Sequence, residues 1–115
     1  MSADNRTSEI ERVHTSGTTQ KNVDVDLPQG TVLEKLECYC YGLECVVISM
    51  YYEDGNKSTI TQHFSHDENN DLVVYSFPQY MIDVINTKGC RKITLSITTT
   101  HNDKPITYNI DTYKI

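Results

Sequence analysis

Apolar and polar residues alternate most clearly over residues 44–64, and this pattern predicts a β-hairpin. A two-residue turn would mix apolar and polar side chains on both faces of the hairpin. A three-residue loop over residues 53–55 instead pairs Ile48 with Ile60 and gives one mostly apolar face. We therefore predict the three-residue loop, with Gly55 in the left-handed conformation.

Shorter alternating segments continue on both sides of this hairpin and predict further strands. The run 72–77 is apolar at nearly every position, which is typical of a strand buried on both faces. We expect the last two segments to form a second hairpin in which Ile97 pairs with Ile106. The alternating segments span residues 22–27, 32–41, 93–98 and 106–111.

Residues 78–88 have the pattern of one short helix. Ser76 is the expected capping residue, Pro78 stands early in the first turn, and apolar residues recur at a spacing of four. Lys88-Gly89 reads as the end of the helix. A strand over the same residues is the alternative.

These elements predict an all-β, mainly antiparallel fold: a β-sandwich or flattened barrel of about seven strands with one short helix. Alanine occurs once in 115 residues, while threonine, isoleucine and tyrosine are frequent, and this composition favours strands. Residues 1–21 are polar and lack periodicity, so we expect a flexible N-terminal tail there. Residues 22–115 are expected to form a single β-sandwich domain.

The formal net charge is −6, from 10 basic and 16 acidic residues, which argues against binding to a nucleic-acid backbone. No apolar run approaches the roughly 18 residues of a membrane-spanning helix, so no membrane association is expected. Residues 1–22 lack the apolar stretch of a signal peptide. We therefore expect a cytoplasmic protein, and a secreted one only if the given N-terminus is not the native one.

Four cysteines are the first candidates for chemistry, and we expect buried free thiols. A disulfide between Cys40 and Cys45 and a zinc site are the alternatives, although the spacing does not match common zinc motifs. No histidine is spaced to act as a base for a cysteine nucleophile. We accordingly predict no enzyme, no catalytic residues, no metal and no cofactor. The cysteines are Cys38, Cys40, Cys45 and Cys90.

Two binding surfaces follow from the pattern. Tyrosine is common at interfaces, and the strand face opposite the core places Leu33, Tyr39, Val47 and Tyr51 in a candidate partner-binding patch. Polar loops offer a second candidate, a lectin-like ligand site with calcium as an optional ligand. Its residues are Asp54, Asp67, Asn69, Asp71, Asn102 and Asp103.

The favoured hypothesis is a small, soluble, non-enzymatic protein-interaction module, such as an accessory or regulatory protein of a virus or microbe. It would bind another protein or itself, for instance as a homodimer. The alternative is the lectin-like ligand-binding module. Chromatography with light scattering tests the first hypothesis, and melting with calcium or sugars tests the second.

Overall fold

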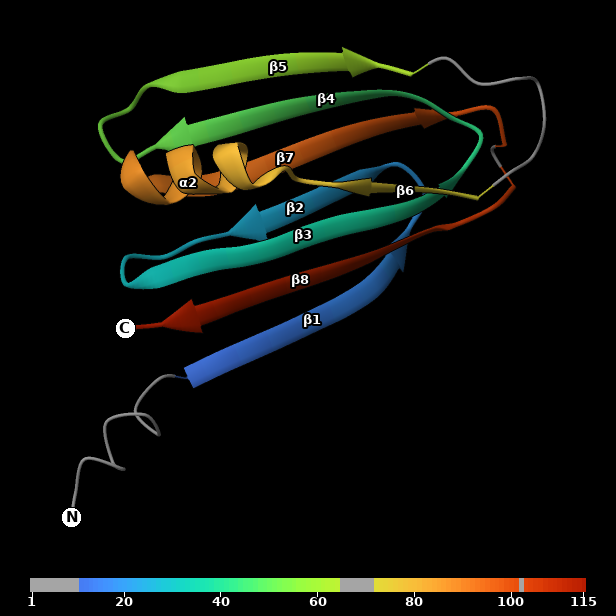
Figure 1. Ribbon diagram of the computed structural model, residues 1–115. Coiled ribbons are helices and arrows are strands. Elements are labelled where there is room, and N and C mark those ends of the chain that lie inside the picture. Colours follow the sequence, from blue (N-terminus) through green and yellow to red (C-terminus); the bar gives the residue numbers. More distant parts are fainter. Residues whose placement is uncertain (1–10, 65–71, 102) are drawn as a thin grey trace.

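Two four-stranded antiparallel sheets pack face to face in the computed structural model, which describes residues 11–64, 72–101 and 103–115 (Figure 1). Sheet A has the strand order β1-β8-β3-β6, and sheet B has the order β2-β7-β4-β5. This arrangement confirms the predicted all-β sandwich with one short helix. The described residues form eight strands and the helix α2: β1 (Glu11–Thr19), β2 (Asn22–Asp26), β3 (Thr31–Tyr41), β4 (Leu43–Tyr52), β5 (Lys57–His63), β6 (Leu72–Ser76), α2 (Gln79–Thr87), β7 (Cys90–Thr99) and β8 (Ile106–Lys114).

The core lies between the sheets and is formed by every second residue of the strands, on the face that points inward. Leu36 and Ile106 reach it from sheet A, while Ile48 and Leu95 reach it from sheet B, and all four are almost fully buried. No polar or charged residue is buried in the described part of the chain. Burying a side chain of this size stabilises the fold by about 1.5–3 kcal/mol, so the alternation dictates which way each sheet faces.

The central hairpin, β4 and β5, has the predicted register. Ile48 pairs with Ile60, and the backbone N–H of Tyr52 donates to the carbonyl of Asn56 at 2.9 Å, which closes a three-residue loop. Gly55 has a φ of +93°, as the loop requires. The inner face of β5 is nevertheless open, because β5 is an edge strand and Ile60 remains 39% exposed.

The predicted second hairpin is wrong. β7 pairs with β2 and β4 in sheet B, whereas β8 pairs with β1 and β3 in sheet A. Ile97 and Ile106 are both buried, but they enter the core from opposite sheets. Alternation reports only that a strand has one buried face, so it cannot separate two strands that pair from two strands that pack face to face.

The prediction of a flexible tail is wrong for Glu11–Thr19, which form β1. All nine residues pair with β8, from Glu11 opposite Lys114 to Thr19 opposite Ile106. The side chains of this strand are exposed or half-buried, so backbone hydrogen bonds to β8 hold it in place. For the same reason its sequence shows no alternation of apolar and polar residues. Residues 1–10 lie outside the described part of the chain.

The prediction that residues 72–77 are buried on both faces is also wrong. β6 is the edge strand of sheet A, and only one of its faces meets the core, through Tyr75. On the other face Leu72 is 48% exposed and Val74 is 49% exposed. An apolar run therefore does not distinguish a central strand from an edge strand whose outer face is also apolar.

Helix α2 follows β6 and confirms the predicted helix. Its buried residues are Met81, Ile82 and Ile85, and Gly89 has the positive φ (+71°) expected after its end. The predicted cap at Ser76 is wrong: the N-cap position is Pro78, and no side chain caps the helix. The helix lies against β3 beyond the end of β6, where Asn86 hydrogen-bonds to the backbone of Leu33.

Within the described residues, no helix is long and apolar enough to cross a membrane.

Candidate interaction surface

The structure does not bring the predicted partner-binding patch together. Leu33 is 1% exposed and belongs to the core, because a β-bulge between Leu33 and Lys35 reverses the alternation of β3. Tyr39 lies on the outer face of sheet A, whereas Val47 and Tyr51 lie on the outer face of sheet B. The chain passes from sheet A to sheet B between β3 and β4. The outward-facing residues of these two consecutive strands therefore lie on opposite faces of the sandwich.

The outer face of sheet A carries an apolar cluster where β3 meets β6. Val74 pairs directly with Tyr39, and Leu72 pairs directly with Tyr41, which is 37% exposed. Directly opposed side chains on one face of an antiparallel pair lie about 4.5–5.5 Å apart at Cβ, so these four form one contiguous surface. We call Tyr39, Tyr41, Leu72 and Val74 the sheet A cluster.

A hollow of about 330 Å³ lies beside the cluster. Its walls combine the two tyrosines and Leu72 with Pro105, just before β8, and with Thr107 of β8. A hollow of this size, beside exposed aromatic rings, can accept one large apolar side chain from a partner. Sheet A therefore offers both an apolar surface and a place for an anchoring residue.

Glu37 fixes the position of Tyr39. The Tyr39 hydroxyl donates to the Glu37 carboxylate at 3.0 Å, Asn109 donates to the same carboxylate at 3.4 Å, and Lys35 lies 3.5 Å from it. The hydrogen bond to Glu37 raises the pKa of Tyr39 above its ordinary value. A ring held in this way loses little conformational freedom on binding, which favours its use as a contact residue.

Charged side chains border the cluster on the same face. Lys104 lies 5.1 Å from the centre of the Tyr41 ring, and farther along the sheet His14 contacts Asp111. Arg12 lies 3.5 Å from Glu34. The face thus changes from an apolar end at β6 to a charged end at the start of β1, so charged side chains lie on one side of the cluster.

The outer face of sheet B is more polar. Val47 and Tyr51 are half-buried there among threonine and serine side chains such as Ser49, Thr61 and Thr94. The ring of Tyr51 is covered by the Lys57 ammonium group, 5.2 Å from its centre. Small hydroxyl-bearing residues separate the two predicted contact residues, so they do not form a continuous apolar patch.

The predicted ligand loops are separated as well. Asp54 lies at the β4–β5 turn, where β7 begins, whereas Asp103 follows the end of β7 at the opposite end of the sandwich. Both carboxylate oxygens of Asp54 accept hydrogen bonds from Asn56, at 2.9 and 2.8 Å, so this side chain stabilises its own turn. Four predicted members, Asp67, Asn69, Asp71 and Asn102, lie outside the described residues.

All four cysteines are free, and Cys38, Cys40 and Cys90 are buried. Burial raises the pKa of Cys38 to about 12 and that of Cys40 to about 11. A thiol with so high a pKa is a poor nucleophile and a poor metal ligand at neutral pH. Over residues 11–64, 72–101 and 103–115, no three histidine, cysteine or carboxylate side chains are grouped to hold a metal ion.

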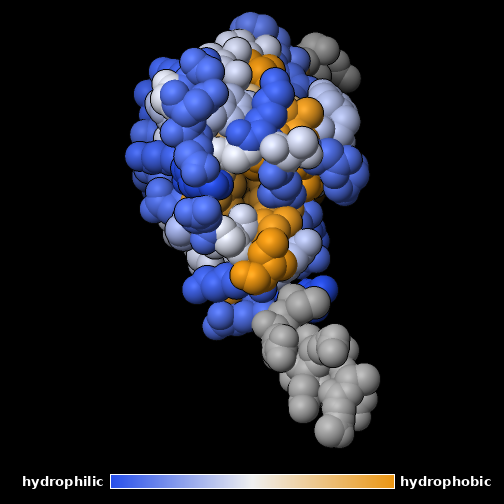
Figure 2. All heavy atoms as spheres, turned by 90° about the vertical axis from the view of Figure 1, so that its left-hand side faces the viewer, coloured by the Kyte–Doolittle hydropathy of each residue, from blue (hydrophilic) through white to orange (hydrophobic). Residues whose placement is uncertain are grey.

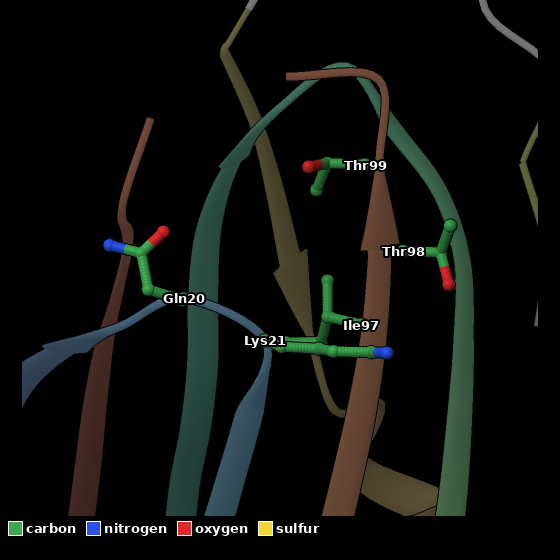
Figure 3. Close-up of a pocket in the computed structure, with 5 residues that line it drawn as sticks. All are labelled: Gln20, Lys21, Ile97, Thr98 and Thr99. Atoms are coloured by element: carbon green, nitrogen blue, oxygen red, sulfur yellow. The ribbon is translucent and has the colours of Figure 1, made fainter. Parts of the chain in front are cut away.

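A second hollow, of about 310 Å³, lies beside the β1–β2 connection (Figure 3). Lys21 is the one charged residue in its lining, and its backbone carbonyl accepts a hydrogen bond from Ile97 at 2.9 Å. Figure 3 shows Thr98 and Thr99 pointing to opposite sides of β7. The lining holds no acid–base pair, so its residues supply no catalytic arrangement.

In comparisons with known proteins, no family model matches the chain, and no curated protein matches its sequence significantly. The candidate surface therefore depends on geometry alone.

Sequence reasoning found Tyr39 but missed the other three members of the cluster. The sequence pattern predicts Leu72 and Val74 in a strand buried on both faces, and it places Tyr41 at the end of the strand segment 32–41. A useful signal was present: β6 is short, it follows a polar segment, and its apolar side chains point both ways. Such a strand at the edge of a sheet must expose one of its two apolar faces.

Proposed function

We propose that this protein is a small, non-enzymatic protein-interaction module that binds a protein partner through the sheet A cluster. The observation that carries the proposal is the pairing of Val74 with Tyr39 and of Leu72 with Tyr41 on an outer face. Apolar side chains exposed in adjacent pairs, rather than singly, are typical of interaction sites. The adjacent hollow and the charged border agree with this function.

The four free thiols favour a reducing compartment, and a cytoplasmic location is part of the proposal. Self-association through the same cluster is the second form of the proposal. The lectin-like alternative loses support, because Asp54 and Asp103 lie at opposite ends of the sandwich.

Site-specific photocrosslinking in cells of the source organism tests the proposal. A benzophenone amino acid replaces Val74 in the cluster, or Val47 on the outer face of sheet B as the matched control. We expect one defined protein adduct from position 74, its loss when Leu72→Lys is added, and no such adduct from position 47. Equal adducts from both positions, or none from position 74, would contradict the proposal.

Light scattering distinguishes the two forms. Partner binding requires a monomer when the purified protein is alone, whereas self-association requires a dimer that Val74→Lys dissociates. Val47→Lys is the control, because it adds the same charge on the opposite face.

A further inference from the structure

The edge strand β5 is the second unusual surface of the molecule, and it lies in the other sheet. All seven of its residues are exposed. Figure 1 shows β5 as the outermost strand of sheet B, and no other described strand pairs with its outer edge. An unpaired strand edge is a template for another strand, and proteins usually protect such edges with charges, bulges or a covering element.

The other three edges show such protection. β1 carries Glu11, Arg12 and His14, and β2 carries Asp24 and Asp26. β6 has five residues and leads directly into α2. In β5, by contrast, residues 58–62 are uncharged, and the pairing with β4 runs from 57 to 63 without a bulge. β5 is therefore an unprotected edge of about 24 Å at roughly 3.4 Å per residue.

The hydrogen-bond pattern identifies which backbone groups of β5 are free. Tyr52 donates to Asn56, and Phe64 donates to Glu44, both at 2.9 Å. Hydrogen-bonded and non-bonded pairs alternate along an antiparallel ladder, so the even-numbered residues of β5 bond to β4. The odd-numbered residues, including Thr59 and Thr61, direct their N–H and C=O groups away from the sheet.

Apolar surface lies on the inner side of the same edge. Ile60 faces inward and is partly exposed, and Tyr80 of α2 is 70% exposed. The two elements share one side of the sandwich, because Tyr75 of β6 donates a hydrogen bond to Gln62 of β5 at 3.2 Å and α2 continues from β6. Figure 2 views the molecule from the end of the sandwich where α2 lies, and it shows hydrophobic atoms exposed between polar ones in its upper half.

We propose that β5 binds an extended segment of another protein, which adds to sheet B as a fifth, antiparallel strand. The free N–H and C=O groups of Thr59 and Thr61 pair with the backbone of this segment. Its inward-facing side chains are apolar and continue the surface that Ile60 begins. This site lies in sheet B and is separate from the sheet A cluster.

Charge selects the partner. The protein as a whole has a net charge of −6, but β5 contains no acidic residue and has Lys57 at one end and His63 at the other. A segment with an acidic residue opposite Lys57, near its own carboxyl end, complements this edge. A second copy does not, since antiparallel pairing about Ile60 places Lys57 of one copy opposite His63 of the other. A single strand edge also offers a rigid second copy far less than the ~1,000 Å² typical of a stable interface.

A defined probe tests the inference: a labelled, end-blocked peptide with the sequence Ser-Val-Thr-Val-Thr-Val-Glu, measured by fluorescence anisotropy. Hydrogen exchange on the unmodified protein gives the decisive readout. We expect the amides of Thr59 and Thr61 to exchange quickly in the free protein and to become at least tenfold slower with saturating peptide. Unchanged exchange at both amides would overturn the inference.

Variants supply the controls. Thr61→Pro removes one outward N–H without removing a bond to β4, and we expect binding at least tenfold weaker. Thr61→Val keeps that N–H and should bind within twofold of the original protein. A peptide that ends in lysine instead of glutamate should bind several-fold more weakly at low salt. Equal binding by Thr61→Pro and Thr61→Val, or a free protein that dimerises until Thr61→Pro is introduced, would overturn the inference.

Discussion

The side chain of Asn86 pairs with the backbone of Leu33 as a neighbouring strand would. The N–H of Leu33 donates to Oδ1 of Asn86 at 3.0 Å, and Nδ2 of Asn86 donates to the carbonyl of Leu33 at 2.9 Å. β6 pairs with residues 37–41 of β3, and the Phe77 N–H donates to the Leu36 carbonyl at 3.0 Å, so Leu33 lies beyond the strand pairing on this edge. The Asn86 carboxamide thus bonds to the backbone of Leu33 where no described strand pairs with that edge.

Replacing Asn86 with alanine should lower the free energy of unfolding by about 1.5 kcal/mol, because two partly buried hydrogen bonds are lost. Asn86→Asp should cost at least as much, since its carboxylate would face the carbonyl oxygen of Leu33. Urea denaturation measures both variants. Gln79→Ala, on the same helix, is the control: it removes only an exposed contact with Asp83 and should cost under about 0.5 kcal/mol.

Gly17 and Tyr108 form a second pair of residues that depend on each other. The Tyr108 ring occupies the space that a side chain at position 17 would need. The two residues are directly opposed between β1 and β8, and a Cβ at position 17 would lie 2.6 Å from the Tyr108 hydroxyl oxygen. Gly17→Ala should therefore displace the ring and destabilise the protein by about 1 kcal/mol.

The sign should reverse when the ring is removed. In a Tyr108→Val background, Gly17→Ala should stabilise the protein by about 0.5 kcal/mol, because alanine restricts the unfolded chain more than glycine does. A double-mutant cycle by urea denaturation measures this coupling. Equal effects of Gly17→Ala in both backgrounds would show that the ring does not restrict position 17.

The buried thiols predict a loss of stability at alkaline pH. An unfolded thiol has a pKa near 9.0, whereas burial raises the pKa of Cys38 to about 12 and that of Cys40 to about 11. The folded state thus keeps its protons where the unfolded state loses them. The stabilisation is complete below pH 9 and declines above it, by up to about 1.4 kcal/mol per pH unit for each thiol.

Urea denaturation between pH 8 and pH 10 measures this decline, since the folded-state pKa values of both thiols lie above that range. A Cys38→Ala/Cys40→Ala variant should be less stable overall but should depend less on pH. A slope that is the same with and without the two thiols would assign the decline to other groups.

Half-buried Cys45 should react with thiol reagents before the other three cysteines do.

The central turn depends on Gly55. Its φ of +93° is strained for any residue with a Cβ, although no atom within 4 Å would contact that Cβ. Gly55→Ala should therefore cost about 1 kcal/mol through backbone conformation alone. Thermal or urea denaturation checks this value, with Ser58→Ala in the adjacent strand as a control expected within about 0.5 kcal/mol. A neutral effect of Gly55→Ala would mean that the loop relaxes to another turn.

Local patterns predicted the local structure well. The register of Ile48 with Ile60, the loop at Gly55 and the helix at 79–87 all depend on neighbours in the sequence, where period and turn chemistry act directly. The partner of each strand was harder to predict. The alternation around Ile97 and Ile106 fits two strands that pair within one sheet, and it fits equally well two strands that pack face to face from different sheets. The structure has the second arrangement.

The surface was predicted least well, for a related reason. A β-bulge after Leu33 moves that residue from the outer face to the core, and its mark in the sequence is the charged pair Glu34-Lys35, which interrupts the alternation between Leu33 and Leu36. Tyr39 and Tyr51 were placed on one face because their strands are consecutive, but the chain changes sheet between them. Conversely, Leu72 and Val74 are exposed because β6 lies at an edge, which is a property of the assembled sheet.

The position of β8 imposes an order on folding during synthesis. β8 leaves the ribosome after the other seven described strands, yet it lies between β1 and β3 in sheet A. The β4–β5 hairpin can form as soon as both of its strands emerge, whereas β1 has no partner among the described strands until β8 has emerged. A nascent chain that stalls before Ile106 would therefore leave β1 and one edge of β3 open to other proteins, including chaperones.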